Sequence, residues 1–318
     1  MWMDTVRGVA IILVIGYHST SILTRFVDHV PTALTAAGDV FSPFRMPILM
    51  LLSGMLLHRS LVKPPRQYFG GKFRSILWPY LLWSFLFLVV SAQLTIGSAV
   101  RVILVPPTYL WYLWFLFVYF VASWFIDRLR LSFLPVAALS MVLAAVVPED
   151  HRISRFFFLF AFFALGHWVS SRQVFGGLAR PWRVLVATCC AALIVVGAVL
   201  SIIEPQAIRY HAAAVWAPLA AVALILLIER FIPTGPIARP IVFVGQNSMV
   251  FYVVHFPVIW IVDWWLRQLD VVNPWVYFVL GVGAACASGY ALVRAEEKWG
   301  VVRALFSWPT ARPATVSK

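Results

Sequence analysis

Residues 184–203 read VLVATCCAALIVVGAVLSII and contain no charged side chain. A run of about 20 apolar residues is what an α-helix needs to cross roughly 30 Å of hydrocarbon. Lipid offers the backbone no hydrogen-bond partner, and the run is much longer than a strand of a membrane barrel, so it predicts a transmembrane helix. The fold therefore follows from how many such runs the chain holds.

Nine further apolar runs lie on both sides of this one along the 318 residues. Hydrophobic residues make up 62% of the chain and charged residues 12%, whereas soluble domains average roughly 45–50% apolar and about 25% charged residues. A water-soluble globular protein is excluded, and an all-α polytopic membrane protein of about ten transmembrane helices is predicted. The runs are residues 6–24, 40–57, 76–96, 110–126, 131–147, 154–170, 184–203, 212–230, 241–262 and 274–293.

Residues 1–306 are predicted to form a single membrane domain, because no polar segment between the runs is large enough to fold alone. Residues 307–318 are expected to be a short cytoplasmic tail. The three cysteines, Cys189, Cys190 and Cys286, lie inside apolar runs without CxxC spacing or histidine-rich neighbours. Neither a disulfide framework nor a metal site is therefore indicated.

The charged residues predict the orientation of the chain in the membrane. The 25 Lys and Arg residues exceed the 12 Asp and Glu residues and give a net charge of +13. With the N-terminus inside the cell, eighteen of the 25 basic residues fall on the cytoplasmic side, six on the other side, and Arg45 within a run. This bias fits the positive-inside rule, so the excess charge needs no nucleic-acid partner. A multi-pass protein of the inner (plasma) membrane with both termini in the cytoplasm is expected.

An ionisable side chain inside the bilayer is costly and marks a candidate functional position. Arg7 and His18 are eleven residues apart in the first run, which on a helix is about 20° beyond three turns and about 16 Å along the axis. Both residues therefore share one face, with Arg7 at the cytoplasmic edge and His18 about halfway through the hydrocarbon. A functional group and a structural histidine bonded to a neighbouring helix both fit the position of His18.

Basic residues also mark the second and third runs. Arg45 lies near the outer end of the second run, where it can hold an anionic substrate or extend to the outer headgroups. Lys72 and Arg74 end the densest basic segment, residues 58–74, which as a whole fits a topology determinant that contacts anionic lipid. Because these two residues lie where the third helix begins, they also suit a phosphorylated ligand arriving from the cytoplasm.

The ninth run, residues 241–262, contains a polar stripe. Ser248 and His255 are seven residues apart, so two helical turns return the chain to within about 20° of its starting direction. Together with Asn247 they form a polar face that leads toward the outer half of the membrane. A substrate held in that half would meet these side chains.

These segments resemble the acyltransferase-3 family of polytopic membrane proteins, in particular its fucose 4-O-acetylase-like branch. They occur in the family's order across nearly the whole chain, and the opening segment is the most specific. Where many relatives have an RxxR element, this chain has Lys72-x-Arg74. The resembling segments are Trp2-x-Asp4-x-x-Arg7-Gly8-x-Ala10-Ile11 with His18-Ser19, Met46-Pro47 with Ser53-Gly54, Lys72-x-Arg74-x-x-Leu77-x-Pro79-Tyr80, Leu113-Trp114-Phe115-Leu116, and Asn247-Ser248 with His255-x-Pro257.

The resemblance implies ten transmembrane helices and transfer of an acyl group to a hydroxyl of a sugar, glycolipid or polysaccharide precursor. The donor that it implies is acetyl-CoA or another acyl-CoA. It also implies that His18 is the essential histidine, that Arg7 is the arginine before it, and that Lys72 and Arg74 are the basic pair at the start of the third helix. An O-acetyltransferase that modifies the cell envelope is the expected function.

The residues present suit that chemistry. A hydroxyl attacks a thioester once a base takes its proton, so His18 is expected to be the general base; an acyl-histidine intermediate would place the same residue in the same spot. Arg7, Lys72 and Arg74 are expected to bind the CoA phosphates, which cannot enter hydrocarbon. No metal is expected. Four polar side chains are expected to line the acceptor side or polarise the carbonyl: Arg45, Asn247, Ser248 and His255.

Two other functions fit the residues alone. A transporter or flippase for a lipid-linked sugar or small polar solute also uses intramembrane His and Arg, although the chain shows no paired halves of the kind many carriers have. A structural or assembly subunit would use the buried polar groups to join helices. Binding of a CoA thioester at the cytoplasmic mouth would favour the acyltransferase over both. The sequence is compatible with acetyl, succinyl and longer acyl groups. It does not specify the oligomeric state.

Overall fold

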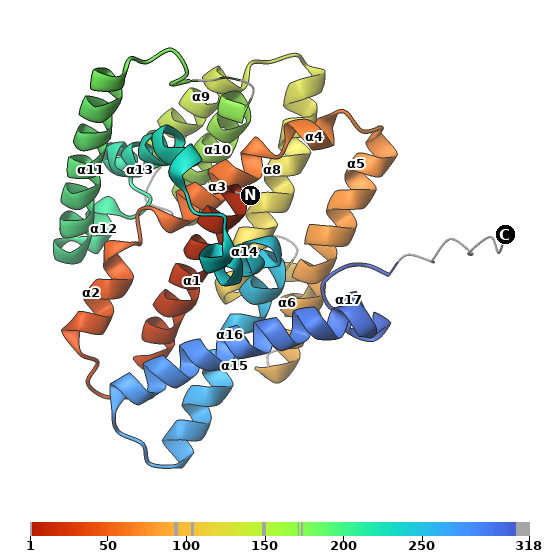
Figure 1. The fold of residues 1–318 in the computed structure, drawn as a ribbon. Helices are drawn as coiled ribbons and strands as arrows, with labels where there is room; N and C mark the ends of the chain where they lie inside the picture. The colour runs from red at the N-terminus through yellow and green to blue at the C-terminus, as the bar shows by residue number, and fades with distance from the viewer. Residues whose placement is uncertain are drawn as a thin grey trace.

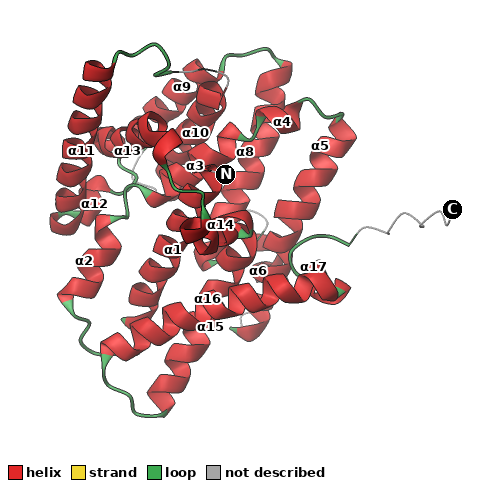
Figure 2. Cartoon of the chain, viewed as in Figure 1, coloured by secondary structure: helices red, strands yellow, loops and turns green. Residues whose placement is uncertain are grey.

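The computed structural model describes residues 2–91, 95–102, 105–147, 151–170, 172 and 174–309. Within these residues the regular secondary structure is entirely helical (Figure 2). The helices pack into one bundle (Figure 1). The predicted all-α class is confirmed.

Nine helical stretches among the described residues are long and apolar enough to cross a membrane. The chain is therefore a multi-pass membrane protein, as predicted. The remaining predicted run, residues 131–147, contains α9 (Phe133–Val146), an apolar helix of 14 residues, which at about 1.5 Å per residue spans about 21 Å. The nine stretches are Trp2–Leu23, Thr32–Leu61, Pro65–Val90, Thr108–Arg128, Arg152–Ser170, Arg180–Ile203, Ala212–Phe231, Ser248–Gln268 and Pro274–Lys298.

Several of these stretches consist of two or more helical elements in series. Besides α9, the elements in chain order are α1 (Trp2–Leu23), α2 (Thr32–Val40), α3 (Arg45–Met55), α4 (His58–Leu61), α5 (Pro65–Lys72), the π-helix η1 (Phe73–Leu77), α6 (Trp78–Val90), α7 (Ile96–Arg101), η2 (Thr108–Leu110), α8 (Trp111–Arg128), α10 (His151–Ser170), α11 (Arg180–Ile203), α12 (Pro205–Ile208), η3 (Ala212–Ala214), α13 (Trp216–Ile228), η4 (Glu229–Phe231), η5 (Pro236–Ala238), α14 (Arg239–Gln246), α15 (Ser248–Gln268), α16 (Pro274–Lys298) and α17 (Gly300–Ala304).

Two of the predicted runs that carry candidate site residues are divided in the structure. The second run, residues 40–57, belongs to a stretch that begins earlier, at Thr32, and is interrupted by a turn at residues 41–44. Arg45 is thus the first residue of α3. The ninth run, residues 241–262, is divided at Asn247 between α14 and α15. At the end of α14 the carbonyl of Phe243 accepts both from the side-chain amide of Asn247 at 2.9 Å and from the backbone N–H of Asn247 at 3.1 Å.

Helix α1 lies inside the bundle, where it packs against α2, α3, α14, α15 and α16. Small residues allow the closest approaches between helices. Gly245 of α14 lies against the backbone carbonyl of Asp4, and Gly54 of α3 lies against that of Phe163 in α10. A Cβ atom at either glycine would collide with backbone, so the missing side chains permit the tight crossings that are common in membrane bundles.

The edges of the bundle are formed by separate parts of the chain. Helices α11, α12 and α13 lie together at one edge, and α5 and α6 lie at another (Figure 1). The end of the described chain returns to α6: the N–H of Trp308 donates to the carbonyl of Arg74 at 3.1 Å, and its ring packs edge-on against Trp78 at 4.4 Å. Trp308 belongs to the predicted tail, whose residues 310–318 lie outside the described residues.

Candidate active site

Two histidines from separate sequence motifs meet inside the bundle. The ring centroids of His18 in α1 and His255 in α15 are 5.1 Å apart. His255 is completely buried, and its Nδ1 lies 3.2 Å from the carbonyl oxygen of Phe251. His18 is partly exposed as a residue, but its Nδ1, like Nε2 of His255, is buried and has no hydrogen-bond partner. The pair therefore holds two buried ring nitrogens that can still accept or donate a hydrogen bond, one of them on an imidazole fixed to its own helix.

The motif His255-x-Pro257 explains how a third aromatic side chain reaches this pair. Pro257 lies inside α15 and has no backbone N–H, so the carbonyl of Val253, four residues earlier, is left without its helical donor. The hydroxyl of Tyr109 donates to that carbonyl at 2.8 Å. Tyr109 also stacks on Phe256 at 4.5 Å between centroids, and its ring lies 5.5 Å from His255. The motif thus holds the segment before α8 beside the histidines.

Two buried tyrosines extend from the histidines toward Arg7. The ring of Tyr252 lies 5.8 Å from that of His255 and 5.1 Å from that of Tyr112 in α8. The Tyr112 hydroxyl lies 3.4 Å from the hydroxyl of Ser53, and Tyr112 interacts electrostatically with Arg7. Polar atoms therefore continue along the interior from His255 to the N-terminal half of α1.

Arg7 lies on α1 near the N-terminal end of the helix. Because α1 is uninterrupted from Trp2 to Leu23, the predicted axial distance of about 16 Å between Arg7 and His18 holds. The side chain of Arg7 is 16% exposed and pairs with the carboxylate of Asp4 at 3.8 Å. Arg7 is thus a cation on the same helix as His18, near the N-terminal end of α1.

Toward the other end of α1, two guanidinium groups lie against the ring of Tyr17, the neighbour of His18. The Cζ atom of Arg45 is 3.9 Å from the Tyr17 ring centroid, and that of Arg209 is 4.8 Å away. The rings of Tyr17 and His18 are 5.2 Å apart. Arg45 is 4% exposed and donates from Nη1 to the carbonyl of Gly38 at 3.1 Å. Both arginine charges act electrostatically on His18.

A third guanidinium group joins these two from α10. The Cζ atom of Arg155 lies 4.6 Å from the ring of Trp111 and 5.7 Å from that of Tyr210. Arg155 interacts electrostatically with Arg209, and Arg209 lies 3.9 Å from the carboxylate of Asp39. Together, Arg45, Arg155 and Arg209 form the arginine cluster.

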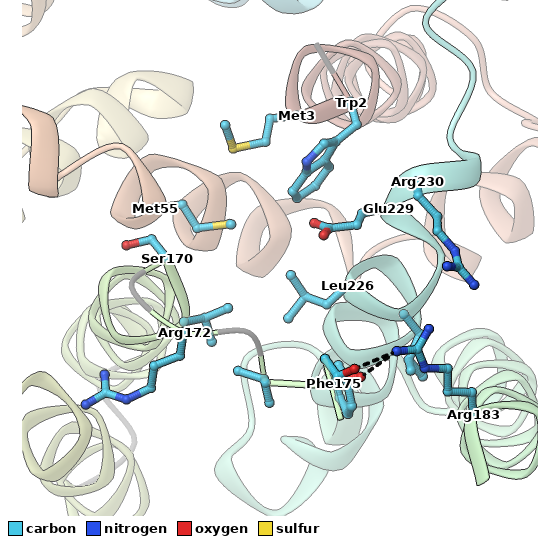
Figure 3. A pocket seen from close by; sticks show the side chains of 14 residues that line it. Trp2, Met3, Met55, Ser170, Arg172, Phe175, Arg183, Leu226, Glu229 and Arg230 are labelled. Atoms are coloured by element: carbon cyan, nitrogen blue, oxygen red, sulfur yellow. Dashed lines mark hydrogen bonds between the residues drawn. The ribbon is translucent and has the colours of Figure 1, made fainter. Parts of the chain in front are cut away.

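A pocket of about 490 Å³ opens at the N-terminal end of α1. Figure 3 shows Trp2 and the carboxylate of Glu229 near its middle, with Arg230 on one side and Arg172 on the other. Arg183 donates from Nη2 to two backbone carbonyls of the adjoining loop, at 3.1 and 3.0 Å. A volume of this size is typical of small-molecule sites, and the pocket lining carries three arginines and one carboxylate, that of Glu229.

The site so far consists of a histidine with an unpartnered ring nitrogen, an arginine-lined pocket at one end of α1 and the arginine cluster near the other. A family model described as an acyltransferase domain, Acyl_transf_3, matches residues 1–294. The chain belongs to the acyltransferase-3 family. No curated protein and no solved structure matches it. The predicted family is confirmed, and membership makes the chain a membrane acyltransferase, which requires an acyl donor.

The acyltransferase holds its predicted basic pair in two different environments. Lys72 donates from Nζ to the hydroxyl of Ser60 at 3.1 Å and lies over the ring of Phe120, 3.5 Å from its centroid. Arg74 is exposed and belongs to η1, a π-helical segment of a kind often found at functional sites. Lys72 is fixed between α4 and α8, whereas Arg74 is open to a ligand or to headgroups. Their part in donor binding stays a prediction.

Two of the four predicted acceptor-side residues of the acyltransferase lie apart from the arginine cluster. Asn247 and Ser248 form the junction of α14 and α15, and α14 packs beside Asp4 at the N-terminal end of α1. Seven residues of α15 separate Ser248 from His255, a rise of about 10 Å. Only the other two, His255 and Arg45, lie beside His18 or Tyr17. The roles of all four stay predictions.

Sequence reasoning missed four residues of the acyltransferase site: Tyr17, Arg155, Arg209 and Tyr210. The two arginines are among the six basic residues that the sequence places on the outer side. Tyr17 has one local signal, since it adjoins His18. Arg209 contacts it from the segment after α12, and Arg155 of α10 lies over Tyr210 of that segment; helical periodicity carries no information on such contacts.

No metal-ligating cluster was found among the described residues: no three His, Cys, Asp or Glu side chains gather where they could hold an ion. The cysteines are free thiols, with Cys189 exposed and Cys190 buried. Among the described residues, His18 and His255 lie side by side without a third His, Cys, Asp or Glu side chain positioned to hold a metal with them.

Proposed function

We propose that this acyltransferase moves an acyl group, acetyl in the first instance, from a cytoplasmic acyl-CoA to a hydroxyl of a sugar, glycolipid or polysaccharide precursor. The observation that carries the proposal is the position of His18, which is inside the bundle, partly exposed and free of a hydrogen bond at Nδ1. The resemblance to the fucose 4-O-acetylase-like branch supports a sugar acceptor. The proposed location is the inner (plasma) membrane, with both termini in the cytoplasm.

His18 acts as the general base in this reaction. Its unpartnered nitrogen accepts the hydroxyl proton while the acceptor oxygen attacks the thioester carbonyl; the C–S bond then breaks, and the CoA thiolate leaves and takes up a proton. A histidine at this position also suits a nucleophile, which would form an acyl-histidine before the acceptor reacts. Trapping of labelled acyl-protein would separate the two routes.

His255 positions the reacting groups. When its Nδ1 donates to the carbonyl of Phe251, its Nε2 keeps a lone pair for a hydrogen bond from His18 or from the acceptor hydroxyl. The rings of Tyr109 and Tyr252 pack against it from two sides. A buried imidazole fixed in this way limits the directions from which a hydroxyl can approach His18.

The donor enters at the N-terminal end of α1. Its phosphates are too polar for hydrocarbon and would bind at the pocket that Arg172, Arg183 and Arg230 line, with Arg7 at the start of the path inward. From Trp2 to His18 the helix rises about 24 Å, and the pantetheine arm would extend along this distance. Lys72 and Arg74 are further candidates for phosphate contacts.

The test uses the detergent-purified full chain, labelled acetyl-CoA and an envelope extract of the source cells as acceptor. We expect acetyl-CoA-dependent labelling of a sugar-containing product. His18→Ala should lower its rate by roughly 10²–10⁴-fold while acetyl-CoA still binds. His29→Ala, at an exposed histidine, is the matched control and should behave as wild type. Near-normal transfer by folded His18→Ala would refute the base, and no acetyl-CoA binding to folded wild type would refute the donor.

A further inference from the structure

The arginine cluster carries more positive charge than its described surroundings neutralise. The carboxylate that pairs with it there is Asp39, 3.9 Å from Arg209. Burial acts to lower the pKa of Arg209, but Tyr17, Tyr210 and Asp39 outweigh it and raise the pKa above its ordinary value, so this guanidinium is charged. Three cations and one carboxylate leave a positive surplus, and such charge away from water is costly unless it is paired.

The stacking of these arginines leaves their N–H edges available. Arg45 and Arg209 lie over Tyr17, and Arg155 lies over Trp111. Stacking uses the flat face of a guanidinium and leaves the in-plane N–H groups for oxygen acceptors. Nε of Arg155 and Nε of Arg209 are buried without a hydrogen-bond partner, whereas Nη2 of Arg209 faces the carboxylate of Asp39 at 3.9 Å, and the Arg209 side chain also hydrogen-bonds that of Tyr17. Because buried donors in proteins are nearly always paired, the two Nε atoms mark the place of an acceptor group.

The cluster is both reachable from outside the bundle and adjacent to the proposed base. The side chain of Arg209 is 25% exposed. It lies over Tyr17, which is fifteen residues along α1 from Trp2 of the pocket shown in Figure 3, a rise of about 22 Å. Tyr17, which contacts two of the arginines, has its ring 5.2 Å from that of His18. A molecule bound here by an anionic group would hold its other groups within reach of His18.

We propose that the acceptor carries an anionic group, a carboxylate or a phosphate, and that Arg45, Arg155 and Arg209 bind it while His18 takes the proton of a hydroxyl on the same molecule. Carboxylates and phosphates match the paired donors of a guanidinium, which a neutral sugar does not. The inference rests on the proposed function and adds the acceptor class: an acidic or phosphorylated sugar.

The experiment locates anion binding on the purified full chain. An arginine-selective dicarbonyl reagent is applied with glucuronate, glucose 6-phosphate or neutral glucose, and modification of each arginine is followed by mass spectrometry. We expect at least one charged sugar to slow modification of Arg209 by roughly tenfold or more, as charge-assisted hydrogen bonds would, and glucose to have no effect. The charged sugar that protects identifies the anion. Arg101, exposed on α7, should react at one rate throughout.

Variants then connect this protection to the cluster. Arg155→Gln should weaken the affinity of the protecting sugar by roughly tenfold, while Arg101→Gln should leave it unchanged. Arg45→Lys keeps the charge but loses the paired donors, so it should also weaken protection. Arg45 is buried, so its variant can lose protection by misfolding. Arg155 is partly exposed, and its variant therefore tests the cluster even if Arg45→Lys does not fold.

Several results would overturn the inference. These are equal effects of charged and neutral sugars, no protection by either charged sugar, and protection that persists in Arg155→Gln. Protection by phosphatidylglycerol nanodiscs, but by no sugar and not by phosphatidylcholine nanodiscs, would also overturn it and assign the cluster to a lipid headgroup. Acetyl-CoA binding is measured on the same samples. If acetyl-CoA binding is retained, only the anionic-acceptor inference has failed. If folded wild-type protein does not bind acetyl-CoA, the proposed function has failed.

Discussion

The two ends of α1 both carry arginines but hold them differently. At the N-terminal end, Arg7 is paired with a carboxylate, and Arg183 is bonded to backbone beside a pocket of about 490 Å³. At the other end, Arg45 and Arg209 lie on the ring of Tyr17, and the three guanidinium groups of the arginine cluster have the single carboxylate of Asp39 beside them among the described residues. The first arrangement suits a large ligand that enters and leaves, and the second suits a small anionic group held in one orientation. Substitutions at one end should therefore affect binding of one substrate and leave binding of the other unchanged.

Among the variants around His18 that compare the two ends, the largest effect is expected at His255. His255→Ala removes the ring that contacts His18 and should lower kcat by roughly a hundredfold, the order expected when a reacting group is slightly misplaced, with unchanged affinity for acetyl-CoA. His255→Gln keeps a hydrogen-bonding side chain and should recover part of the loss. Steady-state kinetics with the acceptor obtained from the envelope extract measure both. A parallel loss of kcat and of both affinities would point to a structural role instead.

The next effect separates the two ends directly. Arg209→Gln should raise KM for the acceptor by roughly tenfold and leave KM for acetyl-CoA unchanged, because it removes a charge-assisted contact on one side only. Arg230→Gln, at an exposed arginine of the pocket, should do the reverse. Initial rates at varied donor and then at varied acceptor give the two values. Equal rises in both KM values for either variant would mean that the ends are not separate sites.

A smaller effect is expected at Tyr17. Tyr17→Leu removes the ring under Arg45 and Arg209 and should raise the acceptor KM several-fold, in line with about 0.5–2 kcal/mol for a cation–π contact. Tyr17→Phe keeps an aromatic face and should lie much closer to wild type. The same kinetic assay compares them. Identical losses in the two variants would show that the hydroxyl matters and the ring face does not.

The smallest effect is expected at Pro257. Pro257→Ala restores an N–H that can bond to the carbonyl of Val253 and so competes with the hydroxyl of Tyr109. One hydrogen bond replaces another, so Tm should change little while kcat falls a few-fold as Tyr109 loosens beside His255. Thermal unfolding and kcat are measured on the same preparation. An unchanged kcat together with a higher Tm would show that Tyr109 does not help to position His255.

Regular patterns in the sequence predicted what lies along a single helix. The separation of Arg7 and His18 follows from the helical period, and the continuity of α1 preserves it. The apolar runs likewise predicted the all-α membrane class. Contacts between helices have no such period: Arg155 and Arg209 reach the Tyr17 region from distant segments, and only tertiary packing brings them there.

Breaks inside hydrophobic runs were also beyond the sequence pattern. The sequence predicts one helix over residues 241–262, through the polar segment Gln246-Asn247-Ser248, yet α14 ends at Gln246 and α15 begins at Ser248. The second stretch turns at residues 41–44, so Arg45 begins a helix in the middle of a span. In α9 the run predicts a helix correctly, but its 14 residues fall short of the roughly 20 needed to cross the hydrocarbon.

The most direct test is equilibrium binding of labelled acetyl-CoA to the purified wild-type protein, to Arg7→Gln and to Arg209→Gln. The two-ended site predicts saturable binding that Arg7→Gln weakens and Arg209→Gln leaves unchanged, because the donor enters at the N-terminal end of α1. Weakening by Arg209→Gln alone, or no binding to folded wild-type protein, would contradict it.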